Sequence, residues 1–188
     1  MPRDSEATKK RLLAAAREEF AAHGLAGARV DRIAAAAESN KAQIYHYFDS
    51  KEGLFDTVWT AYVDEIVGAA SMDVADLPEY AAQLFDRYES EPNSRRLSMW
   101  RRLERGGPHQ PVESIVKENQ ISIDAIADAQ RHGRLPSHFS AEELITLVLT
   151  IAAMWTTQSP ELAKVLRKSS RPRRREVVKD AVRAILAA

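Results

Sequence analysis

Cysteine is absent from the 188-residue chain, and this excludes disulfides, thiolate zinc sites, iron–sulfur clusters and cysteine nucleophiles. A long apolar run is absent too. The most apolar stretch, residues 144–155, is shorter than the roughly 20 residues that a membrane-spanning helix needs. The N-terminal residues lack the apolar core of a signal peptide. We therefore expect a globular, soluble, cytoplasmic protein that has no membrane partner.

An excess of charge of either sign is also lacking, since 27 Lys and Arg side chains balance 27 Asp and Glu side chains. Proteins that bind DNA without sequence preference usually carry a strong basic field, so composition alone does not indicate a nucleic-acid partner. The five histidines show no metal-binding spacing such as His-x-x-x-His, and the serines lie mostly at expected helix caps. We expect no metal, no cofactor and no catalytic residue.

Helical periodicity dominates the sequence, and no run of alternating apolar and polar residues predicts a β-strand. No internal repeat of fixed period is visible. The sequence therefore predicts an all-α fold. The predicted helices lie at residues 5–23, 30–37, 41–48, 51–66, 78–88, 97–103, 111–132, 141–157, from 160 onward, and 173–187.

Local capping signals mark several helix starts. Asn40 can cap the third helix while the side chain of Gln43 reaches back, and Ser50 can cap the fourth. Ser140 and Glu143 form a capping box before the helix that follows them. Gly24 is expected to end the first helix.

Residues 30–48 contain two short helices separated by residues 38–40, which is the layout of a helix-turn-helix. In that motif the second helix enters the major groove of DNA with its N-terminus first. Gln43 can offer a donor and an acceptor to a base edge. Spacing alone leaves open the alternative of an ordinary helix pair with a solvated polar face. The residues that can reach phosphates are Lys41, His46, Tyr47 and Lys51.

Residues 30–54 read VDRIAAAAESNKAQIYHYFDSKEGL, and this string closely resembles the DNA-binding signature of the TetR family of transcriptional regulators. The family signature runs Ile-Ala, then Lys-Gly-Thr-Leu-Tyr-x-Tyr-Phe-x-Ser-Lys-Glu-x-Leu. The resemblance is close over residues 8–60. It implies a helix-turn-helix DNA-binding domain at residues 1–50, joined by the long fourth helix to a helical effector-binding and dimerisation domain at residues 51–188. The DNA-contacting positions that it implies are Arg29, Asn40, Lys41, Ala42, Gln43, Tyr45, His46, Tyr47 and Lys51.

Several positions depart from the family pattern. Glu38 and Ser39 stand where a turn glycine and a valine are usual, so the turn has altered backbone angles or relies on local hydrogen bonds. Arg29 replaces the hydroxyl residue that usually caps the second helix, and it can still reach a phosphate but cannot cap. Ala42 in place of glycine is benign, whereas Gln43 in place of threonine is expected to tune the sequence preference.

One dense basic run, residues 171–175, precedes the last helix. It could touch nucleic acid or the acidic face of a partner, but we interpret it as a solvated loop. Cations at a helix start oppose the helix macrodipole, and the sequence offers no account of this placement.

The helix predicted at residues 141–157 is apolar on almost all sides, and the one at residues 173–187 carries its own apolar stripe. One chain of this size can cover only part of both helices. We predict that they pack against the same pair of a second chain as a four-helix bundle. Such a homodimer would read two half-sites of a near-palindromic operator in double-stranded DNA.

Aromatic and polar residues interrupt the apolar stripes between residues 54 and 155, as they would in a mostly apolar pocket. No Lys or Arg is expected on these inward stripes, so the predicted small-molecule effector is neutral and largely apolar. The alternative is that the same residues fill a dry core. The predicted lining residues are Tyr62, Phe85, Trp100, Asn119, Ile123 and Ile151.

Taken together, these features predict a sequence-specific DNA-binding repressor that a small molecule releases from its operator. The small molecule would bind more tightly to a conformation of the dimer in which the spacing of the two DNA-binding domains does not fit the operator. A regulator that activates transcription, or one that needs no small ligand, is an alternative. From another class, a helical enzyme or a partner-binding protein could retain a vestigial helix-turn-helix.

Overall fold

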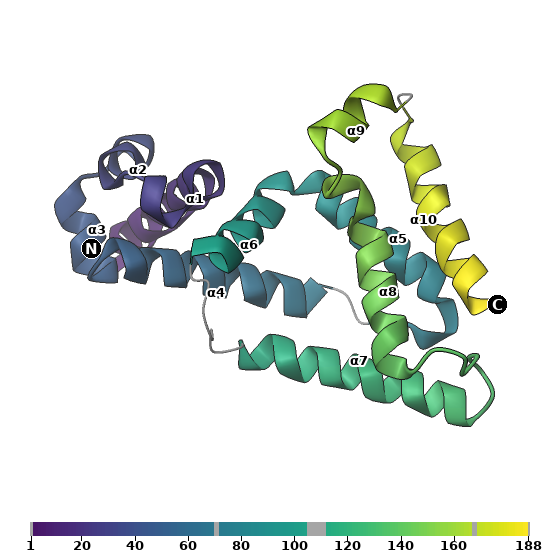
Figure 1. The fold of residues 1–188 in the computed structure, drawn as a ribbon. Coiled ribbons are helices and arrows are strands. Elements are labelled where there is room, and N and C mark those ends of the chain that lie inside the picture. Colours follow the sequence, from purple (N-terminus) through teal and green to yellow (C-terminus); the bar gives the residue numbers. More distant parts are fainter. Residues whose placement is uncertain (1, 70–71, 105–111, 167–168, 188) are drawn as a thin grey trace. The chain divides into compact units, whose positions relative to one another are not determined.

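The computed structural model describes residues 2–69, 72–104, 112–166 and 169–187, and almost all of them are helical (Figure 1). These ranges contain no strand, so the predicted all-α class is confirmed. None of their helices is long and apolar enough to cross a membrane. The elements are α1 (Pro2–Gly27), α2 (Val30–Ala36), α3 (Lys41–Phe48), α4 (Lys51–Ala69), the short 3-10 helix η1 (Val74–Asp76), α5 (Leu77–Ser90), α6 (Pro92–Glu104), α7 (Glu113–Arg131), α8 (Ala141–Ala153), the 3-10 helix η2 (Met154–Thr156), α9 (Pro160–Val165) and α10 (Arg171–Leu186).

The chain divides into two compact units, and each unit draws on two separate stretches of sequence. The first unit contains α1 to α4 together with α6. The second contains α5 and the elements from α7 to α10. The predicted functional boundary at residue 50 stays a prediction, but the compact first unit extends through α4 and takes in α6.

The first unit is built on the buried faces of α1 and α4. Phe20 of α1 and Phe55 of α4 meet edge to face, with their ring centroids 5.1 Å apart. Ile33 of α2 and Ile44 and Phe48 of α3 are buried as well, and α3 packs against α4. The helix-turn-helix is therefore held on α1 and α4 by a shared apolar core.

Several predicted helix ends are confirmed. The hydroxyl of Ser50 accepts a hydrogen bond from the backbone N–H of Gly53 at 2.9 Å. Ser140 and Glu143 form the complete capping box. Gly24 interrupts α1 with φ +70° and ψ −179°, backbone angles that glycine adopts without the steric penalty of a Cβ atom.

The core of the second unit lies between α5, α8 and α10, and α7 packs against α8. Phe85 of α5, Ile126 of α7, Val148 of α8 and Val182 of α10 are fully buried. Burial of such side chains supplies most of the favourable free energy of folding. The unit is thus held mainly by apolar packing among four helices.

The basic run at residues 171–175 is not a solvated loop, so that interpretation was wrong. It forms the first turns of α10, which Ser170 caps. Its guanidinium groups pair with carboxylates of α5, and this offsets the unfavourable position of cations at a helix N-terminus. The pairs between the two helices are Arg171–Asp86 at 3.2 Å, Arg175–Asp86 at 2.7 Å, Lys179–Glu79 at 2.9 Å, Arg175–Glu79 and Arg174–Glu89.

The turn between α2 and α3 keeps a left-handed residue although it lacks the usual glycine. Glu38 has φ +49°. Its backbone N–H bonds to the carbonyl of Ala35 at 3.1 Å, and that of Ser39 bonds to the carbonyl of Ala34 at 2.9 Å. The turn therefore keeps the left-handed backbone conformation that usually requires a glycine, and Glu38 adopts it with backbone strain.

We predict that Glu38→Gly raises the free energy of unfolding by about 1 kcal/mol, because a side chain in the left-handed region costs about 1–2 kcal/mol and glycine escapes most of this penalty. Chemical denaturation of the two proteins measures the difference. As a control, Ala35→Gly in the neighbouring helix should lower the free energy of unfolding by about 1 kcal/mol. If the Glu38→Gly variant were no more stable than the parent, the conclusion that Glu38 is strained would be wrong.

Glu79 should make the stability of the protein sensitive to acid. Hydrogen bonds from Lys179 and then from Arg175 hold the pKa of Glu79 below its ordinary value of 4.5. The stabilisation is thus present above pH 4.5 and is lost as the pH falls through the lowered pKa of the folded state. We predict that Glu79→Gln lowers the free energy of unfolding by about 1 kcal/mol at pH 7, and that the difference vanishes in acid.

Denaturant titrations of both proteins between neutral pH and about pH 3 would measure this effect. Glu176→Gln is the matched control. Glu176 lies on α10, and the nearest cation in the described ranges, Arg183, is 3.9 Å away with both side chains half exposed. An equal deficit for Glu79→Gln at every pH would exclude the proposed linkage.

Candidate nucleic-acid interface

The start of α3 is fixed by local hydrogen bonds. The side chain of Asn40 accepts from the backbone N–H of Gln43 at 3.0 Å, so the predicted cap is confirmed. The side chain of Gln43 does not complete a capping box. Its Oε1 accepts instead from the hydroxyl of Ser39. The serine that replaces the usual turn valine therefore orients the amide of Gln43 at the end of α3 that a recognition helix presents to bases.

Lys41 carries a charge at the first residue of α3. Its Nζ lies 2.6 Å from a carboxylate oxygen of Asp31 on α2, and both side chains are more than half exposed. The hydrogen bond with Asp31 raises the pKa of Lys41 above its ordinary value. The ammonium group is thus protonated at neutral pH and accessible to a phosphate that would replace Asp31.

The outer face of α3 is exposed where the family resemblance places DNA contacts. Ala42, Tyr45 and His46 are all exposed, and 48% of Tyr45 is accessible. Ile44 and Phe48 occupy the opposite face and are buried. The helix therefore separates an apolar anchoring face from an accessible one, as a groove-reading helix requires.

Tyr47 and Lys51 are tied to other parts of the first unit. The hydroxyl of Tyr47 lies 3.0 Å from the hydroxyl of Ser5 on α1. The Nζ of Lys51 donates to the carbonyl of Ala28 at 3.3 Å and to that of Ala26 at 3.5 Å. Lys51 thus bonds to the connection between α1 and α2, and a phosphate contact would add to this or replace it.

Arg29 precedes α2 and makes no side-chain cap, as predicted. The carboxylate of Glu19 on α1 lies at the start of α2 and accepts from the backbone N–H of Arg29 itself at 2.9 Å. The same oxygen accepts from Nε of Arg32 at 2.8 Å. The guanidinium of Arg29 remains exposed, so it is accessible to a phosphate.

Sequence patterns missed two residues that shape this site. Glu19 and Glu104 carried no local signal, because their partners Arg29 and Leu25 lie 10 and 79 residues away in sequence. A charge on an exposed helix face usually means solvation, so periodicity cannot distinguish them. Among the described residues, no group of three or more His, Asp or Glu side chains could hold a metal ion.

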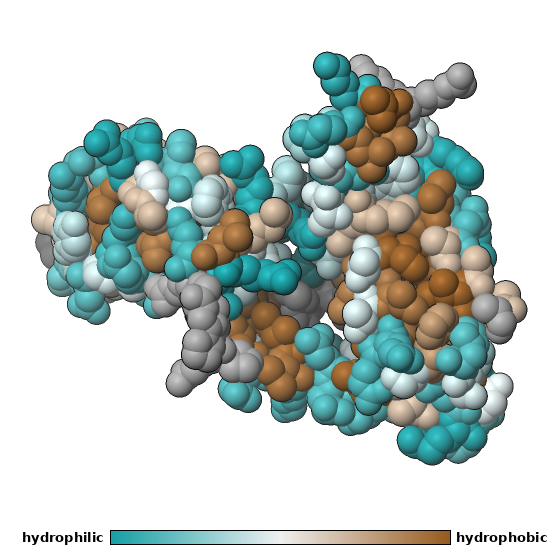
Figure 2. All heavy atoms as spheres, in the orientation of Figure 1, coloured by the Kyte–Doolittle hydropathy of each residue, from teal (hydrophilic) through white to brown (hydrophobic). Residues whose placement is uncertain are grey.

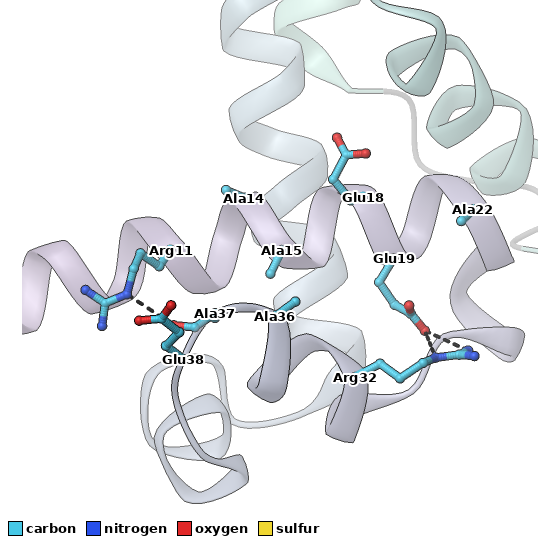
Figure 3. Close-up of a pocket in the computed structure, with 10 residues that line it drawn as sticks. All are labelled: Arg11, Ala14, Ala15, Glu18, Glu19, Ala22, Arg32, Ala36, Ala37 and Glu38. Atoms are coloured by element: carbon cyan, nitrogen blue, oxygen red, sulfur yellow. Dashed lines mark hydrogen bonds and ion pairs between the residues drawn. The ribbon is translucent and has the colours of Figure 1, made fainter.

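A hollow of about 720 Å³ lies along the face shared by α1 and α2 (Figure 3). Five alanines line it, and charged side chains border it. Arg11 donates to the carbonyl of Ala37 at 3.1 Å, and Glu19 pairs with Arg32 at 2.8 Å. None of the predicted DNA-contacting residues lines this hollow, so it is separate from the candidate interface.

The six residues predicted to line an effector pocket are divided between the units. Asn119 is exposed, so its predicted place on a buried stripe was wrong. Burial along α7 begins only at Ser122, because the described parts of the chain leave its N-terminal half uncovered. Ile123 and Ile151 pack half-buried against the core of the second unit. Tyr62 and Trp100 belong to the first unit, and Phe85, Asn119, Ile123 and Ile151 to the second.

A cation lies beside a buried aromatic ring of the first unit. Arg101 of α6 is half-buried, and its guanidinium carbon lies 4.7 Å from the ring centroid of Trp59 on α4. This is the geometry of a cation–π contact. The neutral charge predicted for the effector stays a prediction.

Two family models match the chain. The model described as "Bacterial regulatory proteins, tetR family" matches residues 12–58, and that described as "Tetracyclin repressor-like, C-terminal domain" matches residues 76–184. The curated protein "HTH-type transcriptional repressor SCO4008" of Streptomyces coelicolor is 34% identical over 165 residues, which is 87% of this chain and 85% of that protein.

Solved structures give the same result. The crystal structure of SCO4942 from Streptomyces coelicolor, described as a transcriptional regulator, has a TM-score of 0.84 and 37% identity, and covers 95% of this chain and 97% of that one. A TetR family regulator from Marinobacter aquaeolei shares the fold at 18% identity, with a TM-score of 0.70 and 96% and 98% coverage. Because the two family models match its N-terminal and C-terminal parts, and a curated repressor is 34% identical over 87% of its length, this chain belongs to the TetR family and is a DNA-binding transcriptional regulator.

Proposed function

We propose that the protein is a cytoplasmic transcriptional repressor that binds a near-palindromic operator as a homodimer, leaves it when a small molecule binds, and catalyses no reaction. The observation that carries the proposal is the exposed polar face of α3, which buried Ile44 and Phe48 anchor on the first unit. Repression is supported by the printed names of the relatives, "HTH-type transcriptional repressor SCO4008" and "HTH-type transcriptional repressor NicS" of Pseudomonas putida.

In the first unit, different residues position the protein on the DNA and recognise its sequence. Arg29, Lys41, Tyr47 and Lys51, with His46, bind phosphates and fix the head on the duplex. Gln43 contacts a base edge, with Ala42 and Tyr45 beside it on the accessible face. Asn40 acts through the backbone by holding the N-terminus of α3. The hydroxyl of Ser39 on Oε1 of Gln43 supports this role, because it leaves the amide NH₂ group to donate to a base acceptor.

We predict different effects for Gln43→Ala and Lys51→Ala. Gln43→Ala should relax the preference at one base position by about 1–3 kcal/mol, because a base-edge contact is lost. Lys51→Ala should weaken binding to all sequences and reduce the salt dependence by about one ion equivalent, because a phosphate contact is lost. Selection of duplexes from a random-sequence pool, followed by salt titrations, measures both.

Gln83→Ala, at an exposed position on α5 in the second unit, is the control and should change neither quantity. A preference profile for Gln43→Ala identical to that of the parent would remove Gln43 from the reading role. If the parent selected no sequence from the pool, DNA-specific regulation itself would be excluded.

Dimerisation is typical of this family, and we propose α8 and α10 as the dimer face. Figure 2 shows hydrophobic side chains gathered on the surface over these two helices. An apolar patch of this kind is a common mark of a protein–protein interface. The half-buried apolar residues of the two helices are Leu147, Leu149, Ile151, Val177, Ala181, Ile185 and Leu186.

We predict that Thr150→Arg converts the dimer to a monomer at micromolar concentration, because it places a charge on the face of α8 that would become buried. Thr150 is exposed in the single chain, so the substitution leaves the core of the unit intact. Ser114→Arg, also at an exposed position but on α7, is the control. Analytical ultracentrifugation distinguishes the states. A Thr150→Arg variant that stays dimeric would place the interface elsewhere.

We propose that the effector is a small, largely apolar molecule that binds to the second unit, where Phe85, Ile123 and Ile151 of the predicted lining residues lie. Asn119 belongs to the same unit but is exposed, whereas Tyr62 and Trp100 belong to the first unit, in which Trp100 is bonded to α1. Val116 and Ile121 of α7 support an apolar ligand, since 45% and 52% of their surfaces are accessible in the described structure. Ligand contact would cover such surface and stabilise the state that binds it.

A further inference from the structure

We propose that Glu104 of α6 is a positioning residue for DNA binding, because it holds the connection between α1 and α2 from which the phosphate-binding residues project. This inference rests on the proposed function. α6 comes from the C-terminal half of the sequence, yet it belongs to the compact first unit. It therefore forms part of the body that presents α3, although no DNA-binding motif includes it.

Side chains of α6 supply hydrogen bonds that the end of α1 lacks. The last carbonyls of a helix have no partner within the helix. Nε of Arg96 donates to the carbonyl of Ala21 at 2.8 Å, and Nη2 of the same guanidinium group donates to the carbonyl of Ala22 at 3.2 Å. The indole N–H of Trp100 donates to Ala21 at 3.2 Å. Donors from α6 thus bind carbonyls at the C-terminal end of the regular part of α1.

Beyond the kink at Gly24, the roles of donor and acceptor are reversed. The carboxylate of Glu104 accepts from the backbone N–H groups of both Leu25 and Ala26, the latter at 3.1 Å. A Cβ atom on Gly24 would lie 2.8 Å from the ring of Trp100, which is too close for any side chain. The glycine therefore permits the contact as well as the kink.

The same connection is held from two other helices. The ammonium group of Lys51 on α4 donates to the carbonyls of Ala26 and Ala28. The carboxylate of Glu19 on α1 accepts from the backbone N–H of Arg29. Glu104 and Lys51 thus bind N–H and C=O groups of one short segment. Loss of Glu104 frees the segment that positions Lys51 and carries Arg29.

The expected sign of the effect separates positioning from simple electrostatics. Removing a negative charge from a DNA-binding unit should strengthen its attraction to phosphate. If Glu104 positions the phosphate contacts, its removal weakens binding instead. Glu104→Ala and Glu104→Gln remove the same charge, but glutamine retains an oxygen that can accept one of the two N–H groups. A comparison of the two variants therefore separates the effect of losing the hydrogen bonds from the effect of losing the charge.

The experiment compares the parent, Glu104→Ala, Glu104→Gln and the control Leu103→Ala on a duplex that the parent selects from a random-sequence pool. Leu103 neighbours Glu104 and is 70% exposed. We expect Glu104→Ala to bind about tenfold more weakly at 0.15 M salt, with a slope of log affinity against log salt that is shallower by about one. Glu104→Gln should retain most of the affinity, and Leu103→Ala all of it.

Amide hydrogen exchange without DNA provides a second readout. Exchange at Leu25 and Ala26 should accelerate at least tenfold in Glu104→Ala while core amides of α4 are unaffected, because opening is local. Tighter or unchanged DNA binding by Glu104→Ala with an unchanged salt slope would overturn the proposal, as would unchanged exchange at both amides. If the parent selects no duplex, the proposed function fails, and the exchange rates alone decide whether Glu104 orders the segment.

Discussion

The backbone N–H and C=O groups of the connection between α1 and α2 have no partners within a regular helix and need hydrogen bonds from elsewhere. The first unit is arranged around this requirement. Carbonyls at the end of α1 accept from Arg96 and Trp100, and the next N–H groups donate to Glu104. Lys51 binds the carbonyls of Ala26 and Ala28. Because α6 supplies many of the side chains that bond to this connection, the first unit depends on residues far outside the helix-turn-helix motif. The family motif alone is therefore not the whole structural unit.

Charge pairing between helices plays the corresponding part in the second unit. Arginines at the start of α10 would oppose the helix macrodipole if they were solvated. The carboxylates of Glu79 and Asp86 on α5 face them and convert the same charges into a contact between helices. Apolar packing of α5, α8 and α10 brings the two rows together, so the ion pairs specify which helices meet rather than drive their burial.

Features whose causes are local in sequence could be predicted. The caps at Asn40, Ser50 and Ser140 depend on partners three residues away, and Gly24 ends a helix through its own backbone freedom. The helix-turn-helix followed from helical spacing together with a long motif. The effector residues were less accessible to such reasoning, because a helical stripe shows which residues share a face but not what covers that face. Asn119 illustrates this, since it shares a stripe with Ser122 yet is exposed.

The sequence by itself determined the helical class, the caps of several helices and which face of α3 is exposed, because periodicity, caps and turn residues act within a few positions. Only the tertiary structure decided that Glu19 binds the backbone N–H of Arg29 at the start of α2, that Glu104 holds the connection after α1, and that the basic run pairs with α5. Each of these contacts joins residues between 10 and 96 positions apart. A charged side chain has the same local pattern whether it is solvated or paired, and its partner is fixed only when the helices pack.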